Sequence, residues 1–228
     1  MDACTRIECL PGTHADILQF IDDWQSNMEA DQHILWLYGL AGSGKSTLAT
    51  TIANLFSEWG CLGAFVFFDQ DVQERNQPSN VIGTIAHQFG SFNAQLGAVI
   101  AAVVDNMPRI SLSPLSLQFT KLLVGPLLTV PWTESSIVIV MDALDERVDR
   151  KRLLTILAVE SIRLPSFICI IITSRDKFNL RAAFMGKAHI SIQELDISTK
   201  CNVQDILAFL QIRMKEIQDA NASLLPPD

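Results

Sequence analysis

Five short segments of the sequence are almost continuously apolar, and longer stretches with helical patterns separate them. The five segments are residues 34–38, 61–68, 137–141, 167–172 and 188–193. A strand with one face in water alternates apolar and polar residues, whereas a strand buried on both faces in a parallel sheet is apolar throughout. The pattern therefore predicts an α/β fold of three layers, in which helices flank both faces of a five-stranded parallel sheet.

Helical spacing of apolar residues accounts for most of the chain around these strands. It predicts helices over residues 15–24, 45–59, 81–104, 115–124, 150–162, 178–184 and 203–217, with a polar loop over 69–80. The chain has 228 residues, of which 49% are hydrophobic and 18% are charged, so it is too apolar to be disordered and has the size of one domain. We expect an N-terminal segment with an amphipathic helix over 1–33, the sheet domain over 34–220 and a frayed tail over 221–228.

A glycine-rich octapeptide follows the first apolar strand directly. Residues 39–46, Gly-Leu-Ala-Gly-Ser-Gly-Lys-Ser, match the phosphate-binding pattern GxxxxGK[ST] at the start of a predicted helix. Its glycines let backbone N–H groups turn toward phosphate oxygens, and the helix N-terminus adds partial positive charge. We expect Lys45 to contact the β- and γ-phosphates of ATP or GTP and Ser46 to bind Mg²⁺. The predicted nucleotide-binding residues are Gly39, Ala41, Gly42, Ser43, Gly44, Lys45, Ser46 and Thr47.

The apolar segment 137–141 is followed directly by a carboxylate, which a magnesium site beside a phosphate-binding loop requires. Residues 137–141 are followed by Asp142, and Asp145 and Glu146 come just after. We expect Asp142 to share the Mg²⁺ ion with Ser46, and Asp145 or Glu146 to orient a water molecule toward the γ-phosphate. The bland alternative is a solvated acidic cluster at the start of a helix.

The apolar segment 167–172 is followed abruptly by polar residues, Thr173, Ser174 and Arg175. The carboxyl ends of parallel strands meet at one edge of a sheet, where open α/β sheets bind their ligands. We therefore expect these three side chains to converge with the glycine-rich loop and with Asp142. Arg175 then either contacts the γ-phosphate or forms a surface ion pair with a nearby acid.

Charge and cysteine usage exclude several other functions. Lys and Arg number 17 against 25 Asp and Glu, a net charge of −8 that disfavours a nucleic-acid partner. The five cysteines show no CxxC or Cys/His spacing, so a zinc or disulfide framework is not expected and reduced thiols fit a cytoplasmic protein. No apolar run approaches the roughly 18 residues of a membrane span. The four histidines, His14, His33, His87 and His189, have no ligand spacing and are interpreted as structural or exposed.

Together these motifs resemble the NACHT domains of the STAND class of P-loop NTPases, in the form found in nephrocystin 3-like N-terminal regions and fungal NLR-like proteins. The likeness covers nearly the whole chain, at residues 9–14, 36–47, 84–88, 125–127, 142–146, 164–165, 173–175 and 205–210. Its more selective mark is the small Ala143 after the first acid, followed by two further acids. The family usually carries Arg where this chain has His14, near the nucleotide base.

The resemblance implies a conformational switch that binds ATP or GTP and changes its self-association or its contacts with NLR-like partner domains. It also implies that the strand ending at Thr173 lies between the phosphate-loop strand and the Asp142 strand. The winged-helix, effector and repeat modules of such proteins are not within these residues, so we expect a truncated product, a fragmentary gene model or a stand-alone domain.

Two functions remain open at this point, and a third is disfavoured. The first is a slow NTPase switch in signalling, and the alternative is an interaction scaffold that holds nucleotide with little or no hydrolysis. A P-loop kinase for a small molecule would need a second pocket with basic lid residues, and residues 107–131 offer only Arg109 and Lys121.

Overall fold

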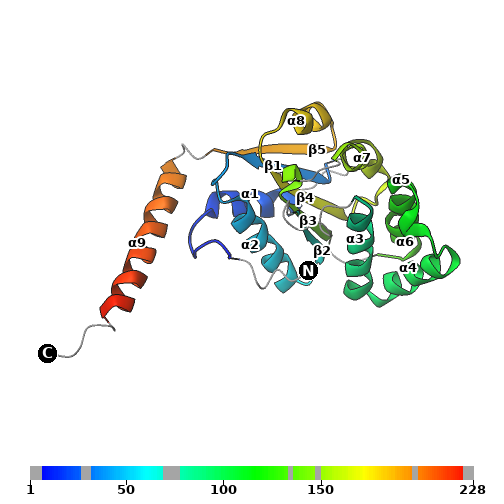
Figure 1. Ribbon diagram of the computed structural model, residues 1–228, viewed down its shortest axis with the longest axis horizontal. Coiled ribbons are helices and arrows are strands. Elements are labelled where there is room, and N and C mark those ends of the chain that lie inside the picture. The colour runs from blue at the N-terminus through cyan, green and yellow to red at the C-terminus, as the bar shows by residue number, and fades with distance from the viewer. Residues whose placement is uncertain are drawn as a thin grey trace.

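The computed structural model describes residues 7–26, 32–68, 78–132, 136–146, 150–196 and 200–222. Five strands, β1 (Ile34–Gly39), β2 (Leu62–Phe67), β3 (Ile137–Asp142), β4 (Ile168–Ser174) and β5 (Ile190–Leu195), form one parallel sheet in the order β2-β3-β4-β1-β5 (Figure 1). The predicted five-stranded parallel sheet is confirmed. The position of β4 between β1 and β3 also agrees with the resemblance, and β4 and β5 each run two residues past their predicted ends.

Helices connect the strands and cover both faces of the sheet. They are α1 (Ala15–Ser26), α2 (Lys45–Glu58), α3 (Pro78–Phe92), α4 (Ala94–Asn106), η3 (Ile110–Leu112), α5 (Leu115–Gln118), η4 (Phe119–Val124), α6 (Gly125–Thr129), η5 (Leu144–Glu146), α7 (Arg150–Thr155), η6 (Ile156–Glu160), η7 (Ser161–Arg163), α8 (Phe178–Phe184) and α9 (Lys200–Ala222). Most of the predicted loop 69–80 lies outside the described residues. Of the tail predicted to fray over 221–228, residues 221–222 instead end α9, and residues 223–228 lie outside the described residues.

Alternation of side chains along the strands divides the core into two layers. Trp36 and the residues in step with it pack under α3 to α8, whereas Leu35 and Leu37 pack under α1 and α2 on the opposite face (Figure 1). The amphipathic face predicted for the first helix is confirmed, because Ile21 is buried in the second layer and Trp24 packs against it. The N-terminal helix is thus part of the same core as the sheet.

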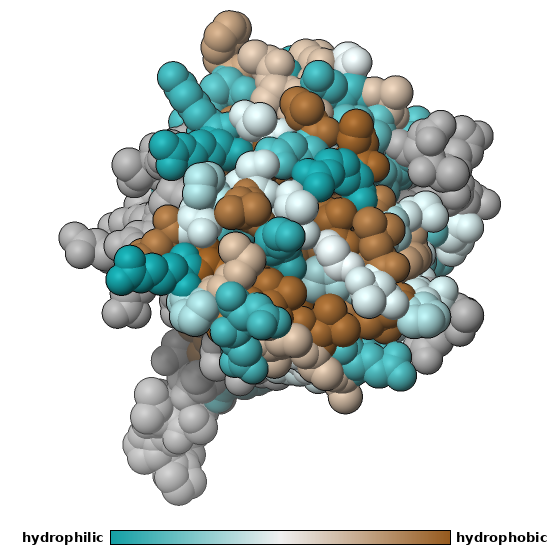
Figure 2. Space-filling view, turned by 90° about the vertical axis from the view of Figure 1, so that its right-hand side faces the viewer, coloured by the Kyte–Doolittle hydropathy of each residue, from teal (hydrophilic) through white to brown (hydrophobic). Residues whose placement is uncertain are grey.

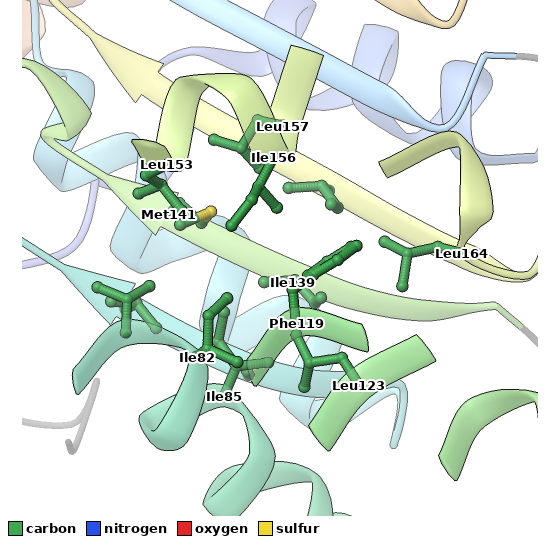
Figure 3. Packing of buried hydrophobic residues seen from close by; sticks show 14 of the residues in the cluster. Ile82, Ile85, Phe119, Leu123, Ile139, Met141, Leu153, Ile156, Leu157 and Leu164 are labelled. Atoms are coloured by element: carbon green, nitrogen blue, oxygen red, sulfur yellow. The ribbon is translucent and has the colours of Figure 1, made fainter. Parts of the chain in front are cut away.

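The larger layer fills the space between the sheet and the helices that follow β2. Figure 3 shows Ile82 of α3 and Phe119 and Leu123 of η4 packed beneath Ile139 of β3. Leu153 of α7 and its neighbours belong to the same layer and pack beside Met141 near the end of β3 (Figure 3). This packing holds β3 rigidly, and β3 carries Asp142 at its end.

The helix predicted over 81–104 is wrong in one respect, because the structure has two helices there. Asn93 adopts an extended conformation between α3 and α4, and its Oδ1 accepts hydrogen bonds from the backbone N–H groups of Gln95 and Leu96. This is an N-cap, which starts a new helix in a different direction. Gly90 and Gly97 then let the two helices approach closely, since a Cβ on Gly97 would lie 2.9 Å from the Gly90 carbonyl oxygen.

The prediction that a helix ends before Pro126 is also wrong. Helical structure runs without a break from Leu115 to Thr129, through α5, η4 and α6. The Gly125 N–H donates to the Thr120 carbonyl, the wider pattern of a π-helix, so the hydrogen bonding changes just before the proline. Pro126 then stands in the first turn of α6, where its missing N–H costs little.

The last helix is longer than predicted and stands away from the rest of the molecule. α9 begins three residues before and ends five residues after the predicted range 203–217, and it extends outward from the sheet domain (Figure 1). None of the described helices combines the length and the hydrophobicity that crossing a membrane requires.

Candidate functional site

The glycine-rich loop joins the end of β1 to the start of α2 at the carboxyl edge of the sheet. Gly42 and Gly44 have φ values of +80° and +77°, which L side chains adopt only with strain. Gly39 has a different reason to be glycine, because a Cβ there would lie 2.9 Å from the Leu195 carbonyl oxygen of β5. The loop is thus held against the neighbouring strand and aims the first turn of α2 outward.

Lys45, the first residue of α2, folds back over this loop. Its Nζ donates to the carbonyl oxygens of Gly39, at 3.0 Å, and of Leu40, and to Ser43 Oγ at 3.1 Å. Burial lowers the pKa of the Lys45 amine below its usual value, and the charges of Asp145, Arg175 and Asp142 also act on that pKa. These four charged groups therefore lie at one site. Of the other predicted loop residues, Ala41 and Ser46 are exposed, Ser43 is buried and Thr47 is half-buried.

Asp142 connects the loop helix to the sheet. Its side chain is fully buried, and its Oδ1 accepts hydrogen bonds from Ser46 Oγ at 3.2 Å and from Thr173 Oγ1 at 2.6 Å. Thr173 Oγ1 in turn accepts from the Ala143 N–H at 3.3 Å. A hydroxyl of α2, a carboxylate of β3 and a hydroxyl of β4 therefore share one contact, as expected of strands that end at the same edge.

Ser174 does not converge with this group, which corrects the expectation for the end of β4. Successive side chains of a strand point to opposite faces, so Thr173 faces α2 and Ser174 faces the other layer. There Ser174 Oγ accepts a hydrogen bond from Trp36 Nε1 at 2.8 Å and donates to the Arg175 carbonyl at 3.0 Å. Ser174 thus holds the strand end in place, and it does not face the glycine-rich loop.

The acidic residues after β3 turn back toward β4. Ala143 has a φ of +57°, a left-handed conformation that costs least for a small side chain, and η5 follows it at once. Asp145 is buried, at 3% exposed, and its Oδ1 accepts from the Arg175 N–H at 2.9 Å. Arg175 also pairs through its guanidinium with Asp145, at 3.6 Å, and with Glu146, at 3.2 Å. The two acids and Arg175 are therefore brought together, and Arg175 forms ion pairs with both, as one of the two alternatives for this residue anticipated.

A cavity of about 300 Å³ lies beside the loop, on the side of β5. His14 lines it together with Ser43, Asp205 and the end of β5. The His14 N–H donates to Asp205 Oδ2 of α9 at 2.8 Å, and a Cβ on Gly44 would lie 3.0 Å from His14 Nε2. From its residue type alone His14 was interpreted as structural or exposed, and only the resemblance placed its position near the nucleotide base. The signal was its position in the N-terminal motif of the resembled family, and nothing local in the sequence linked it to Asp205, 191 residues away.

Among the described residues, no group of three or more His, Cys, Asp and Glu side chains could hold a metal ion. Cys9, Cys61 and Cys169, the cysteines within the described residues, are not joined in disulfides.

The chain matches the family model described as Nephrocystin 3, N-terminal, over residues 12–175. This range begins just before α1 and ends at Arg175, so it includes the glycine-rich loop, Asp142, Asp145 and Glu146. No curated protein matches the chain.

Two solved structures are similar to the chain. The Orc1 protein of Aeropyrum pernix, in a complex with DNA, has a TM-score of 0.52 at 18% identity, over 92% of this chain and 50% of that protein. PCH-2 of C. elegans has a TM-score of 0.37 at 11% identity, over 79% of this chain and 42% of that protein, and this weaker likeness carries no argument. The chain thus spans half the length of the Orc1 protein, and it has the α/β fold of P-loop NTPases.

Proposed function

The chain belongs to the nephrocystin 3 N-terminal family, and on this premise we propose that it binds ATP or GTP with Mg²⁺ and hydrolyses it slowly. In this proposal the nucleotide state switches the conformation and self-association of a NACHT-like signalling domain within residues 34–220. One observation carries the proposal: Ser46 at the start of α2 hydrogen-bonds Asp142 at the end of β3. This contact brings the backbone of the glycine-rich loop, the Ser46 hydroxyl and the Asp142 carboxylate together at one edge of the sheet.

The glycine-rich loop and Lys45 would bind the phosphates. The N-terminus of α2 supplies N–H groups and partial positive charge. The Lys45 amine donates to the Gly39 and Leu40 carbonyls, within the loop that phosphate oxygens would enter. Phosphate oxygens are stronger acceptors for an ammonium group than backbone carbonyls. Lys45 would therefore exchange these loop contacts for the β- and γ-phosphates.

Ser46 and Asp142 would hold a Mg²⁺ ion. A hydroxyl and a carboxylate oxygen 3.2 Å apart suit this cation, which binds oxygen ligands and commonly takes only one or two from the protein beside phosphates and water. The ion would neutralise charge on the phosphates. Thr173, which donates to Asp142 Oδ1 at 2.6 Å, fixes the orientation of that carboxylate.

Glu146 is better placed than Asp145 to orient the attacking water. The oxygens of Asp145 contact the N–H and the guanidinium of Arg175, and its side chain is only 3% exposed. The Glu146 side chain is 28% exposed and pairs with Nη2 of Arg175. In this assignment Asp145 positions Arg175, and Arg175 responds to the γ-phosphate.

The cavity beside His14 would receive the nucleotide base. It adjoins Ser43 of the loop, and its side chains offer both hydrogen-bonding groups and the apolar faces of Ile17 and Phe20. Aromatic and apolar walls with a few polar groups are typical of sites for flat ligands. The choice between adenine and guanine would then depend on His14 and Asp205.

A thermal-shift titration tests nucleotide binding directly. ATP, GTP and ADP, each with and without Mg²⁺, are added to the wild-type chain, to Lys45→Ala and to Lys121→Ala, an exposed lysine remote from the site. At 100 times its Kd a ligand stabilises the fold by about 2.7 kcal/mol, a shift of roughly 5–10 °C at this size. We expect the shift in the wild type and in Lys121→Ala and its loss in Lys45→Ala. An equal thermal shift in Lys45→Ala would contradict the assignment of residues 39–46 as a phosphate-binding loop.

The scaffold alternative keeps a specific observation in its favour. The 3.2 Å ion pair between Arg175 and Glu146 engages the two groups that hydrolysis would need. If the pair persists with nucleotide bound, the chain would hold its ligand with little turnover. Single-turnover hydrolysis with excess protein separates the two functions, because only the NTPase converts bound triphosphate to diphosphate within the lifetime of the complex.

A further inference from the structure

A second cavity, of about 540 Å³, lies between α5 and α7. It is larger than the cavity beside His14 and falls within the range of roughly 300–1,000 Å³ that sites for small molecules occupy. Its walls are residues 112–116 and four residues along α7 and η6, namely Arg152, Thr155, Ile156 and Glu160. Figure 2 looks onto the side of the molecule where α5 and α7 lie in Figure 1, and apolar residues are exposed there among polar ones. The proposed nucleotide site uses none of these residues.

Hydrogen bonds within the protein hold both walls of this cavity in place. Ser116 Oγ of α5 donates to Glu160 Oε2 of η6 at 2.6 Å, which ties one wall to the other. The buried Gln118 side chain donates to the Ser113 carbonyl at 2.9 Å and to the Ser111 carbonyl at 3.1 Å. A cavity that is formed in advance loses little conformational freedom when a ligand enters it.

The wall formed by α7 and η6 has a cationic end and an anionic end. Arg152 and Glu160 lie eight residues apart on one continuous helical run, or roughly 12 Å at 1.5 Å per residue. The second part of this run, η6, is a π-helix, and both of its end residues, Ile156 and Glu160, line the cavity. Turns of this wider kind occur frequently at functional sites.

Arg152 is the group in this cavity that remains available to a ligand. The three hydroxyl groups of the lining already donate to Glu160 or to backbone carbonyls. Glu160 pairs with Arg163 at 3.6 Å, so its negative charge is compensated. Arg152 is exposed and forms no ion pair with any residue that the structure describes. The lining side chains therefore offer one uncompensated positive charge, at one end.

The remainder of the lining is apolar. Leu115 and Ile156 are 5% and 2% exposed and belong to the larger core layer, and Leu112 lies at the rim with 81% of its surface exposed. A sugar or a nucleoside would place many polar groups against these side chains without partners, which weakens binding. The lining suits a ligand with one anionic group and an apolar body.

We propose that this cavity binds a small monocarboxylate with an apolar chain. Its carboxylate pairs with the Arg152 guanidinium, a contact that is commonly bidentate, and its chain lies over Leu115 and Ile156. A phosphate monoester carries close to two negative charges, and the cavity offers one free cation. The net charge of −8 disfavours a strongly acidic peptide as the occupant, whereas a ligand with a single charge meets little of this repulsion.

NMR saturation-transfer titrations of the full chain with octanoate, over about 0.1–20 mM, test the proposal. We expect saturable binding with a Kd on the order of 1 mM for a ligand of this size. Octylammonium has the same chain and the opposite charge, and it should bind at least about tenfold more weakly. Equal affinity for the two ligands would contradict the role of Arg152.

Two variants that each lose one positive charge separate a contact from general electrostatics. Arg152→Gln should weaken octanoate binding about tenfold. The matched control is Lys151→Gln, at an exposed neighbour on the same helix that does not line the cavity, and it should change the Kd by less than about twofold. Equal weakening in both variants would overturn the proposed contact, as would the absence of saturable binding in the wild type.

A blocking variant tests the place of binding. Thr155 is exposed and lines the cavity, so Thr155→Trp puts a large ring into it without disturbing the core, and octanoate binding should be lost at an unchanged Tm. Undiminished binding in Thr155→Trp would place octanoate elsewhere. Lys45→Ala should bind octanoate as the wild type does, so a failure of nucleotide binding leaves this test intact. Loss of octanoate binding in Lys45→Ala would instead place the carboxylate at the glycine-rich loop.

Discussion

Asp142 ends β3 with its side chain on the sheet face that α2 covers, and this orientation decides which neighbours act with it. Ser46 and Thr173 lie on the same face and bond its Oδ1, whereas Ser174, one residue further along β4, lies on the opposite face and bonds Trp36. Alternation along the strand thus separates the hydroxyl that bonds Asp142 from the hydroxyl that bonds Trp36. The left-handed Ala143 then reverses the chain so that the next acids approach β4.

Exchanging the two acids for amides distinguishes their roles. We expect Glu146→Gln to lower the rate of hydrolysis about 100-fold, in the range of a lost base, with nucleotide affinity little changed. Asp145→Asn loses its ion pair with a half-exposed Arg175 and should change the rate less than about tenfold. The rates come from a phosphate-release assay at saturating nucleotide. The assignment fails if Asp145→Asn is the more damaging change.

At the scale of elements, the parallel sheet is built from strands that both core layers cover. β4 is the central example: each of its residues is buried, and Cys169 is wholly inaccessible within the layer beneath α1 and α2. Burial raises the pKa of the Cys169 thiol from 9.0 to about 11, with the Ser136 side chain acting in the opposite direction. The neutral thiol is thus part of the packing of the strand.

This burial predicts a loss of stability in alkali. The folded-state pKa lies above the unfolded one, so the contribution of Cys169 is complete below pH 9 and disappears as pH rises to about 11. Two pKa units correspond to roughly 2–3 kcal/mol. Urea unfolding at pH 8 and pH 10.5 measures it, and we expect the wild type to lose more stability between these two pH values than Cys169→Ala. Equal losses would mean that the thiol already ionises in the folded chain.

At the scale of the whole molecule, the site joins segments from both ends of the chain. α1 packs on the same core layer as α2, and His14 just before it bonds Asp205 and leaves no room for a side chain at Gly44. The N-terminal segment therefore belongs to the site as much as the sheet does. α9 is different, because its first turns reach the site through Asp205 and the remainder leaves the body (Figure 1).

A chain ending at residue 199 tests how far the body depends on α9. The body packs without it, so we expect the free energy of unfolding to fall by no more than about 1 kcal/mol, or roughly 2–4 °C in Tm. The tryptophans all precede α9, and their fluorescence reports on the body alone. Measurement below 1 µM, roughly, limits the contribution of any dimer. A larger drop in Tm would show that α9 stabilises the body by packing on it.

The sequence by itself determined the features that depend on neighbours along the chain. Continuous apolar runs predicted five buried strands, the glycine-rich octapeptide predicted a tight loop before a helix, and Asp142 followed its strand. Covalent geometry and periodicity fix such patterns locally. The sequence also predicted an unbroken helix over 81–104, where Asn93 in fact starts a second helix. It predicted a helix end before Pro126, where a π-helical turn lets the helix continue.

Only the tertiary structure decided the contacts between distant residues. Strand order and register placed Thr173 against Asp142 and turned Ser174 to Trp36, and the return of the chain after β5 brought Asp205 to His14. It also left the apolar residues of α9 exposed, although such residues in a helical pattern are typical of a helix packed on a core. A pattern states that a face will be buried, and the arrangement of all other elements determines what is available to bury it.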